Sequence, residues 1–315
     1  MIVAENEGAA SPASRKIAYL CCEGTASWST DRRHDAFEHD ESLEIFAPAF
    51  RARGIVLEEV VWDAPGTDWR RFDGALIGTA WDYARSPDAF LAKLELISSQ
   101  VPLSNDLDAV RWNVDKSYLR DLERRGAPSI PTFWYDDLRQ ADLDDVLRGL
   151  GAAKLVIKPV IGAGGCDQFV SEDGKRPPDD HPLWRQKVMI QPLLEAIRSE
   201  GEYSFIYFDR IFSHALRKTP APSEYRVQSV YDGKMHGLTP SAADQTASQA
   251  IMKALPHRPL YARIDMVRRD DGQLALMECE LIEPYLFPEF DDSKGERMAL
   301  AAKAWLDRSA RESHS

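Results

Sequence analysis

The chain has 315 residues, of which 44% are hydrophobic and 29% are charged, and its formal net charge at pH 7 is −12. This length and composition predict a globular protein of two or three compact units. The negative charge argues against a general nucleic-acid-binding protein, which would present a basic face. No apolar run approaches the length of a membrane span, so we expect no membrane partner.

Residues 1–14 are mostly small and polar, and they lack the apolar core of a signal peptide, so we expect a flexible tail. The four cysteines (Cys21, Cys22, Cys166 and Cys279) do not have the spacing of metal ligands. Reduced thiols in a cytoplasmic protein are the simplest interpretation.

Strand and helix patterns alternate over residues 15–112. Strands are predicted at Lys16–Cys21, Ile55–Trp62 and Gly74–Gly78, and helices at Glu41–Arg53 and Pro87–Ser98. This alternation is typical of an N-terminal α/β domain built on a parallel sheet.

Ligands of such sheets bind beyond the carboxyl ends of the strands. Two polar-aromatic loops are expected there, Glu23–Asp40 and the segment that contains Trp81, Asp82 and Tyr83. We assign these last three residues to a substrate site. The alternative is that Trp81 and Tyr83 only cap the sheet.

Residues 113–190 are expected to form a second, smaller subdomain. Asp115 has the character of a helix N-cap, for a helix that ends near Gly126. Lys116 then falls in the first turn, where the helix dipole disfavours a cation but an anion can approach. Lys116 is therefore either an anion-binding residue or a surface lysine whose stem lies along the helix.

A glycine-rich loop follows the predicted strand Lys154–Val160, in which Val156 and Lys158 share one face. The loop contains Gly162, Gly164 and Gly165, whose bare backbone can approach phosphate oxygens closely. The spacing is neither that of a P-loop nor that of a dinucleotide fingerprint. We interpret Cys166, beside the loop, as a small residue rather than a nucleophile.

The third predicted unit spans residues 191–315. A connector, Gln191–Leu194, follows a buried strand, since Pro192 cannot donate a ladder hydrogen bond. Hairpins are predicted about Asp209-Arg210 and about Asp232-Gly233, the second pairing Tyr225–Tyr231 with Lys234–Leu238. Further predicted features are a helix that Thr239-Pro240 opens and three cations between the hairpins, Arg217, Lys218 and Arg226.

The most informative stretch is Tyr261–Phe287, which is predicted to form two strands joined by a two-residue turn at Asp271-Gly272. This register places Asp265 opposite Glu278 and Arg263 opposite Glu280, all on one face. Like charges at such a distance repel each other, and a divalent cation between the carboxylates removes that repulsion. The alternative is a solvated face with an Arg263–Glu280 ion pair.

Together these features resemble the ATP-grasp superfamily of ligases, as in D-alanine–D-alanine ligase and glutathione synthetase. The resemblance covers residues 105–290, and its most specific part is the spacing of Arg263, Asp265, Glu278 and Glu280. Glu280 stands where many relatives have Asn. The resemblance implies an α/β (α+β) ATP-grasp fold behind an N-terminal α/β domain.

The resemblance also implies a role for each site residue, with ATP and two Mg²⁺ ions as cofactors. Lys116 and Lys158 would hold the α- and β-phosphates, under a mobile lid that contains Gly162, Gly164 and Gly165. Gln191–Leu194, which includes Leu193, would line the adenine slot, and Glu202, or alternatively Glu195, would bind the ribose. Phosphoryl transfer would be stabilised by Lys218, Arg226 and Arg263. Metal would be held by Asp265, Glu278 and Glu280, with the alternative that Glu280 only pairs with Arg263.

The implied activity is ADP-forming ligation of a small amino-acid-like carboxylate through an acyl phosphate, with a homodimer as a further expectation. The segments Arg111–Leu119, Ala80–Tyr83 and Ile282–Pro284 look like a narrower branch that includes D-cycloserine synthetase, which closes O-ureido-D-serine into a ring. The chemistry needs no covalent nucleophile, and we expect His214 to be a core residue. A nucleotide-binding regulator without turnover is the third alternative, suggested by Glu280.

Overall fold

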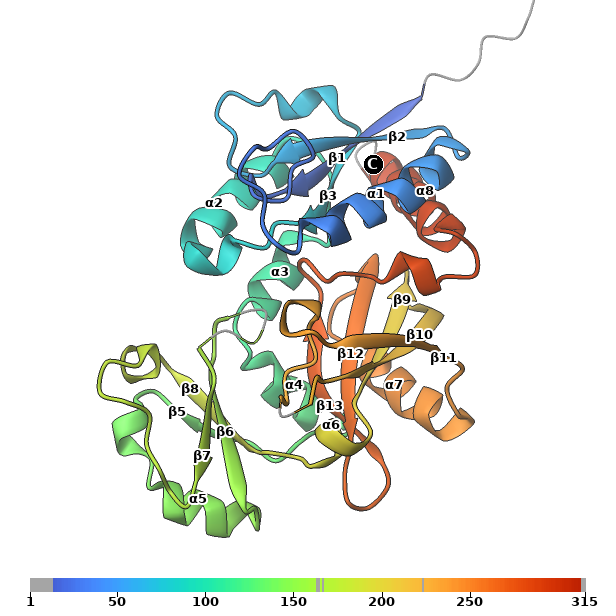
Figure 1. Ribbon diagram of the computed structural model, residues 1–315. Coiled ribbons are helices and arrows are strands. Elements are labelled where there is room, and N and C mark those ends of the chain that lie inside the picture. The colour runs from blue at the N-terminus through green and yellow to red at the C-terminus, as the bar shows by residue number, and fades with distance from the viewer. Residues whose placement is uncertain (1–13, 163–164, 166, 223, 313–315) are drawn as a thin grey trace, which may run out of the picture.

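The computed structural model describes residues 14–162, 165, 167–222 and 224–312. These residues form three sheets that follow one another along the molecule (Figure 1). The predicted tail lies almost entirely outside the described residues, as does Gly164. No helix in the described part is long and apolar enough to cross a membrane.

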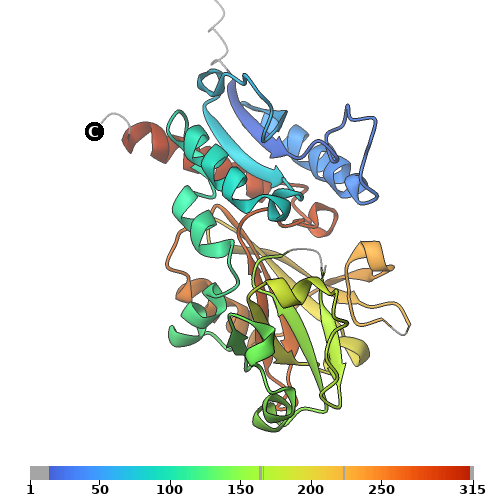
Figure 2. The same cartoon turned by 90° about the vertical axis from the view of Figure 1, so that its left-hand side faces the viewer.

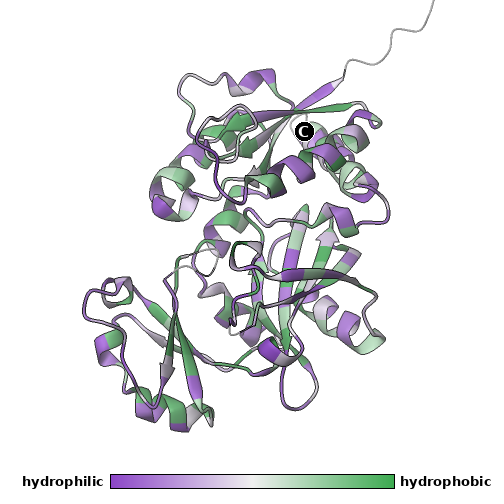
Figure 3. Cartoon of the chain, viewed as in Figure 1, coloured by the Kyte–Doolittle hydropathy of each residue, from purple (hydrophilic) through white to green (hydrophobic). Residues whose placement is uncertain are grey.

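The N-terminal sheet is parallel, as predicted, and has the strand order β2-β1-β3-β4. Successive residues of β1 face opposite layers: Ile17 and Tyr19 pack with helices α1 and α8, and Ala18 and Leu20 with α2. Figure 3 shows hydrophobic residues gathered on these strands. The elements are β1 (Arg15–Cys21), α1 (Ala36–Arg51), β2 (Ile55–Val61), β3 (Gly74–Thr79), α2 (Pro87–Ser98), β4 (Leu103–Ser104) and α8 (Glu296–Glu312).

The second sheet is antiparallel, has the order β5-β8-β6-β7, and is covered on one face by α5 (Figure 2). Leu155 and Ile157 pack under that helix, whereas Val156 and Lys158 face a cavity, as their alternation predicts. We call this the lid sheet. Its elements are β5 (Phe133–Tyr135), α5 (Leu143–Leu150), β6 (Lys154–Pro159), β7 (Phe169–Glu172) and β8 (Val188–Pro192).

The third sheet has five antiparallel strands in the order β11-β10-β9-β12-β13. Helices α4 and α7 pack on one face, and the opposite face carries the charged side chains of the site. Its strands are β9 (Glu202–Phe208), β10 (Ile211–Thr219), β11 (Lys234–Leu238), β12 (Tyr261–Arg268) and β13 (Leu274–Glu280). The remaining α-helices are α3 (Leu107–Asn113), α4 (Tyr118–Arg124), α6 (Ala196–Ser199) and α7 (Ala242–Ala254), and short 3-10 turns lie at residues 69–71, 83–85, 138–140, 182–185, 229–231 and 288–290.

Several predicted boundaries were wrong. Residues 225–231 are not a strand, because β11 pairs with the long strand β10 and the chain between them is a loop with a 3-10 turn. Helix α7 is capped by the Ser241 side chain, which accepts from the Asp244 N–H, rather than by Thr239. Helix α1 begins at Ala36, before the predicted Glu41. Helix α4 begins at Tyr118, so Lys116 lies in the turn that precedes it.

The C-terminal helix α8 returns to the N-terminal sheet, where it packs beside α1 (Figure 1). The domain boundaries at residues 112 and 190 stay a prediction.

His214 is buried, with ring nitrogens 2.9 Å from Ser213 Oγ and from the Leu286 carbonyl, which confirms its expected place in the core.

Two buried asparagines tie the N-terminal part of the chain to the β12–β13 hairpin. Asn105 donates to the carbonyls of Tyr261 and Leu281 (2.9 and 2.7 Å) and accepts from the Leu260 N–H (2.6 Å). Asn113 donates to the Cys279 carbonyl and accepts from the Leu281 N–H, each at 2.8 Å. These contacts satisfy backbone groups at the end of β13, where the sheet ladder stops.

We expect Asn105→Ala to lower the free energy of unfolding by about 2 to 4 kcal/mol, because it leaves three buried backbone groups without partners. Urea denaturation measures the change. Gln249→Ala removes an amide from the exposed face of α7 and is the matched control, with an expected change below about 0.5 kcal/mol. Equal stability of the two variants would contradict the assignment of Asn105 as a clamp.

Candidate active site

The β12–β13 hairpin pairs Asp265 with Glu278 and Arg263 with Glu280, which confirms the predicted register at the site. The predicted two-residue turn is wrong, since Arg269 and Gln273 close a three-residue loop. A β-bulge between Asp265 and Met266 shifts the register by one residue. This shift compensates for the longer loop and leaves the predicted pairing at the site intact. The bulge also places Met277, predicted on the opposite face, on the cavity wall beside Glu278.

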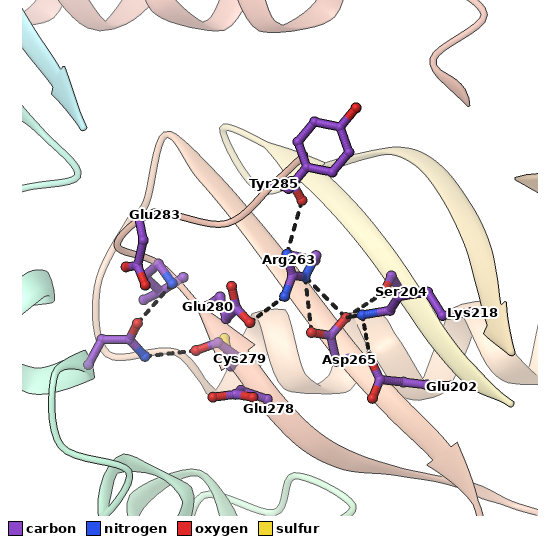
Figure 4. A network of polar contacts seen from close by, with 12 residues as sticks. Glu202, Ser204, Lys218, Arg263, Asp265, Glu278, Cys279, Glu280, Glu283 and Tyr285 are labelled. Atoms are coloured by element: carbon purple, nitrogen blue, oxygen red, sulfur yellow. Dashed lines mark hydrogen bonds and ion pairs between the residues drawn. The ribbon is translucent and has the colours of Figure 1, made fainter. Parts of the chain in front are cut away.

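Asp265, Glu278 and Glu280 are each bound to a cation, and Figure 4 shows the contacts of Asp265 and Glu280. Asp265 contacts Lys218 Nζ at 3.2 Å and Arg263 Nε at 3.0 Å, and Arg263 also pairs with Glu280. Glu278 pairs with Lys116 from the turn before α4. Within the described residues no three acidic, His or Cys side chains are placed to share a metal ion. The repulsion foreseen between facing carboxylates is thus relieved here by lysines and an arginine.

Burial and these partners set the protonation of the network. Burial alone would raise the pKa of Asp265, but Arg263 and Lys218 outweigh it and the pKa is lowered. The pKa of Glu278 is lowered in the same way, with Lys116 as the main opposing charge. Burial raises the pKa of Glu280 to about 7, and Glu278 and Asp265 add to the rise although Arg263 opposes it.

Glu202 is also part of this network. Its carboxylate forms an ion pair with Lys218, and both side chains are only 4% exposed. Burial raises the pKa of Glu202, since the effect of Lys218 is smaller. Glu202 lines the cavity, but its ion pair differs from the free ribose acceptor that the resemblance implies.

Two lysines meet on the lid side of the cavity. The Lys116 N–H donates to the Val160 carbonyl at 2.9 Å, which brings the turn before α4 against the end of β6. Lys158 Nζ donates to Gln191 Oε1 at 3.1 Å, and burial lowers the pKa of Lys158. Both lysines line the cavity, so Lys116 is not the surface lysine of the alternative interpretation.

The cavity lies between the lid sheet and the five-stranded sheet, and part of its lining is apolar. The apolar lining residues, which accompany Gln191, are Ile130, Val156, Met189, Leu194, Ile197 and Met277. Leu193 is not among the lining residues, and its N–H bonds the Lys154 carbonyl. Sequence reasoning did not single out Ile130, Met189, Ile197 or Met277, because their sequence pattern is that of any core residue.

Arg226 lies on the loop between β10 and β11 and borders the cavity. It pairs with Glu224 at 2.7 Å and stacks on Tyr231, with its guanidinium carbon 3.6 Å from the ring centroid. Gly165 has φ +71° and lies against Arg226 and Gln228, so a side chain at this position would strain the backbone. Gln228 is a lining residue that the mistaken strand prediction concealed.

The cavity does not include Trp81, Asp82 or Tyr83. The Trp81 indole donates to the Glu283 carbonyl at 2.9 Å, Asp82 accepts from the Trp62 indole at 2.8 Å, and Tyr83 packs on Phe90. These contacts cap the N-terminal sheet, as the alternative foresaw. The assignment of the three residues to a substrate site stays a prediction.

A cavity between two antiparallel sheets, with lysines on one wall and paired carboxylates on the other, defines the class of ATP-grasp ligases. The structure of D-alanine–D-alanine ligase from Bacillus anthracis has a TM-score of 0.68 at 17% identity, covering 95% of this chain and 99% of that chain. The structure of the ATP-grasp ligase PsnB with Mg and ADP has a TM-score of 0.62 at 15% identity, covering 93% and 99%. These similarities establish the fold.

Sequence similarity defines the family. The cycloserine biosynthesis protein DcsG of Streptomyces lavendulae is 30% identical over 284 residues, which are 83% of this chain and 93% of that protein. Residues 17–105 match the N-terminal domain of D-cycloserine synthetase DcsG, whose crystal structure has a TM-score of 0.79 at 24% identity, covering 92% and 99%. The chain belongs to the DcsG family of ATP-grasp ligases, which confirms both the superfamily and the branch that the sequence resembles.

The raised pKa of Glu280 predicts a pH-dependent stability. The ordinary value is 4.5 and the folded value about 7, so the folded chain binds this proton more tightly than the unfolded chain. The resulting stabilisation is fully present below pH 4.5 and is lost as the pH rises through 7. Relative to Glu280→Gln, which cannot titrate, the wild type should lose on the order of 2 to 3 kcal/mol between pH 4.5 and pH 8.

Urea denaturation of the two proteins at both pH values, without nucleotide or divalent ions, measures this difference. Glu172→Gln, on the lid-sheet strand β7, is the control for removal of an exposed carboxylate. A wild-type-to-variant difference that stays constant with pH would contradict the prediction.

Proposed function

We propose that the protein is an ATP-dependent, ADP-forming ligase that activates a small amino-acid-like carboxylate as an acyl phosphate and joins it to an amine or a related nucleophile. One observation carries this proposal: five cations and four carboxylates line a single cavity, namely Lys116, Lys158, Lys218, Arg226, Arg263, Glu202, Asp265, Glu278 and Glu280. A solvated ion-pair face would not bring side chains from two sheets and the α4 turn together in this way.

The arrangement suits a nucleotide that lies along the cavity. The apolar residues that line the cavity would pack against the adenine ring, and Gln191 lines the same cavity. Lys116 and Lys158 stand where they could bind the α- and β-phosphates, and Gly162 and Gly165 leave room for phosphate oxygens beside the backbone. In the structure of the D-alanine–D-alanine ligase from Bacillus anthracis, ATP is bound to a chain of this fold.

The carboxylates of Asp265, Glu278 and Glu280 have the oxygen donors that Mg²⁺ prefers. Since they form no complete metal-binding group by themselves, phosphate oxygens would have to supply further ligands, which fits a metal bound together with its nucleotide. Bound there, two Mg²⁺ ions would neutralise phosphate charge. Lys116, Lys218 and Arg263, which hold the carboxylates in this structure, would then be free to contact phosphates.

The residues also suit the chemistry of phosphoryl transfer. Charge develops on the transferred phosphoryl group, and catalysis consists mainly of positioning and electrostatic stabilisation. Lys218, Arg226 and Arg263 are the cations available for this group, and Arg263 is held in place by Asp265, Glu280 and the Tyr285 carbonyl.

A cytoplasmic location is also part of the proposal. The free thiols of Cys21, Cys22 and Cys279 favour this location. The homodimer stays a prediction.

Glu278→Gln should lower ADP formation at least about 100-fold in the presence of the true substrate, because it removes a charge from the metal-binding face. A coupled assay of ADP release over a panel of carboxylates and amines measures the effect. Glu44→Gln, an exposed carboxylate on α1, is the control and should keep wild-type activity. Turnover retained in Glu278→Gln would reject the proposed mechanism.

Ring closure of the D-cycloserine synthetase type is the second candidate function. It is favoured by the match of residues 17–105, the part of the chain that contains Trp81, Asp82 and Tyr83, to the N-terminal domain of D-cycloserine synthetase. We expect ADP release when O-ureido-D-serine and ATP are supplied, and a cyclic product detectable by mass spectrometry. No ADP with this compound, together with ADP from a linear pair of the panel, would leave only the first candidate.

A further inference from the structure

The loop between β10 and β11 contains two side-chain atoms that are buried and lack a hydrogen-bond partner, Arg226 Nε and Gln228 Oε1. In the described part of the chain only one other buried side-chain nitrogen or oxygen is unpartnered, Ser171 Oγ on the lid-sheet strand β7. Arg226 and Gln228 both line the cavity of the site. Because an unpaired buried polar atom is costly, two such atoms on one cavity wall indicate a surface that a ligand completes.

The two side chains meet beside the glycine-rich loop. A Cβ on Gly165 would lie 3.4 Å from Arg226 Cδ and 3.4 Å from Gln228 Oε1, so both side chains approach the same point. The rest of the Arg226 guanidinium is occupied, since Nη2 donates to Glu224 at 2.7 Å and the group stacks on Tyr231. One free donor and one free acceptor therefore lie together, next to the backbone that we assign to phosphate oxygens.

The backbone around Gln228 is fixed before any ligand binds. The Tyr231 N–H donates to the Gln228 carbonyl at 2.9 Å. The preceding residue, Val227, is buried in an apolar cluster, and the following residue, Ser229, donates to Glu38 on helix α1. A side chain on a backbone held in this way is oriented in advance, which lowers the cost of binding a ligand.

The free acceptor decides the kind of ligand. Phosphate oxygens could pair with Arg226 Nε, but they offer no hydrogen to Gln228 Oε1. The donors of ATP belong to its adenine and ribose and not to the phosphoryl group that is transferred. We propose that Gln228 Oε1 accepts a hydrogen bond from the N–H of the nitrogen nucleophile and orients that nitrogen for attack. This inference rests on the proposed function and names a residue that binds its second substrate.

A neutral amide suits the chemistry of this attack. The nitrogen lone pair forms a bond to the carbonyl carbon of the acyl phosphate, and the C–O bond to the phosphate breaks. The proton that the nitrogen loses leaves with the phosphate as hydrogenphosphate. A protonated amine has no lone pair for this step, and a carboxylate in the place of Gln228 would favour that charged form. The amide carbonyl accepts the N–H without adding a negative charge.

Calorimetry of protein loaded with a non-hydrolysable ATP analogue and Mg²⁺ tests the inference in the wild type, Gln228→Met and Gln228→Glu. The probes are two pairs in which one member has an N–H-bearing group that the other lacks, O-ureido-D-serine with O-methyl-D-serine and D-alanine with propionate. The wild type should bind the first member of at least one pair about 5- to 100-fold more tightly than the second. Gln228→Met should abolish this preference, and Gln228→Glu, which keeps an acceptor, should retain it.

Gln249→Met, on the exposed face of α7, is the matched control and should keep the preference. A preference that survives in Gln228→Met overturns the inference. A preference lost equally in Gln228→Glu also overturns it, because the buried amide atom would then act as a donor. Gln228→Met should bind the ATP analogue within about 3-fold of the wild type, and an equal loss of analogue and probe affinity would assign the amide to the nucleotide instead.

Steady-state kinetics separates this inference from the proposed function. With any pair of the panel that releases ADP, Gln228→Met should raise the KM of the nitrogen substrate at least about 5-fold and leave the KM of ATP unchanged. ADP release with an unchanged KM for the nitrogen substrate keeps the ligase function and rejects the role of Gln228. A probe preference that depends on Gln228, without ADP from any pair, rejects the proposed function and keeps the binding site. Equal binding of both members of each pair by the wild type, with no ADP from any pair, overturns the inference.

Discussion

The structure depends on the charge balance across the β12–β13 hairpin. Strand register brings Asp265 and Glu278 face to face, and Glu280 lies two residues further along. Buried carboxylates at this spacing repel each other, so each requires a cation. The cations come from different elements, Lys116 from the turn before α4 and Lys218 from β10. Electrostatics therefore joins parts of the chain that are distant in sequence at one place.

The same charge balance gives the site its chemical character. In the proposed function, a triphosphate and its metal ions would exchange partners with the network: phosphate oxygens replace carboxylates on the lysines, and metal replaces lysine on the carboxylates. Such an exchange needs no large rearrangement of the five-stranded sheet, because both sets of charges already line the cavity. Glu280, where many relatives have Asn, is held by Arg263 and is compatible with this arrangement.

The β12–β13 hairpin is also tied to the N-terminal part of the chain. The N-terminal sheet, the C-terminal helix α8 and the hairpin share a core, and Asn105, Trp81 and Tyr261 cross between them through buried hydrogen bonds. The segment after β13 is consequently fixed from both sides.

The sequence by itself determined the class of protein, the three-part organisation of its sheets and most of the charged residues of the cavity, because strand alternation and charge spacing are local properties. The sequence pattern even predicted the pairing of Asp265 with Glu278, although two errors cancelled. The turn is one residue longer than predicted, and a bulge at Met277 shifts the register back by one residue. Only the tertiary structure decided how the charges are matched, because ion pairs such as Lys116–Glu278 join residues that are far apart in the chain and meet only when the turn before α4 packs against the hairpin.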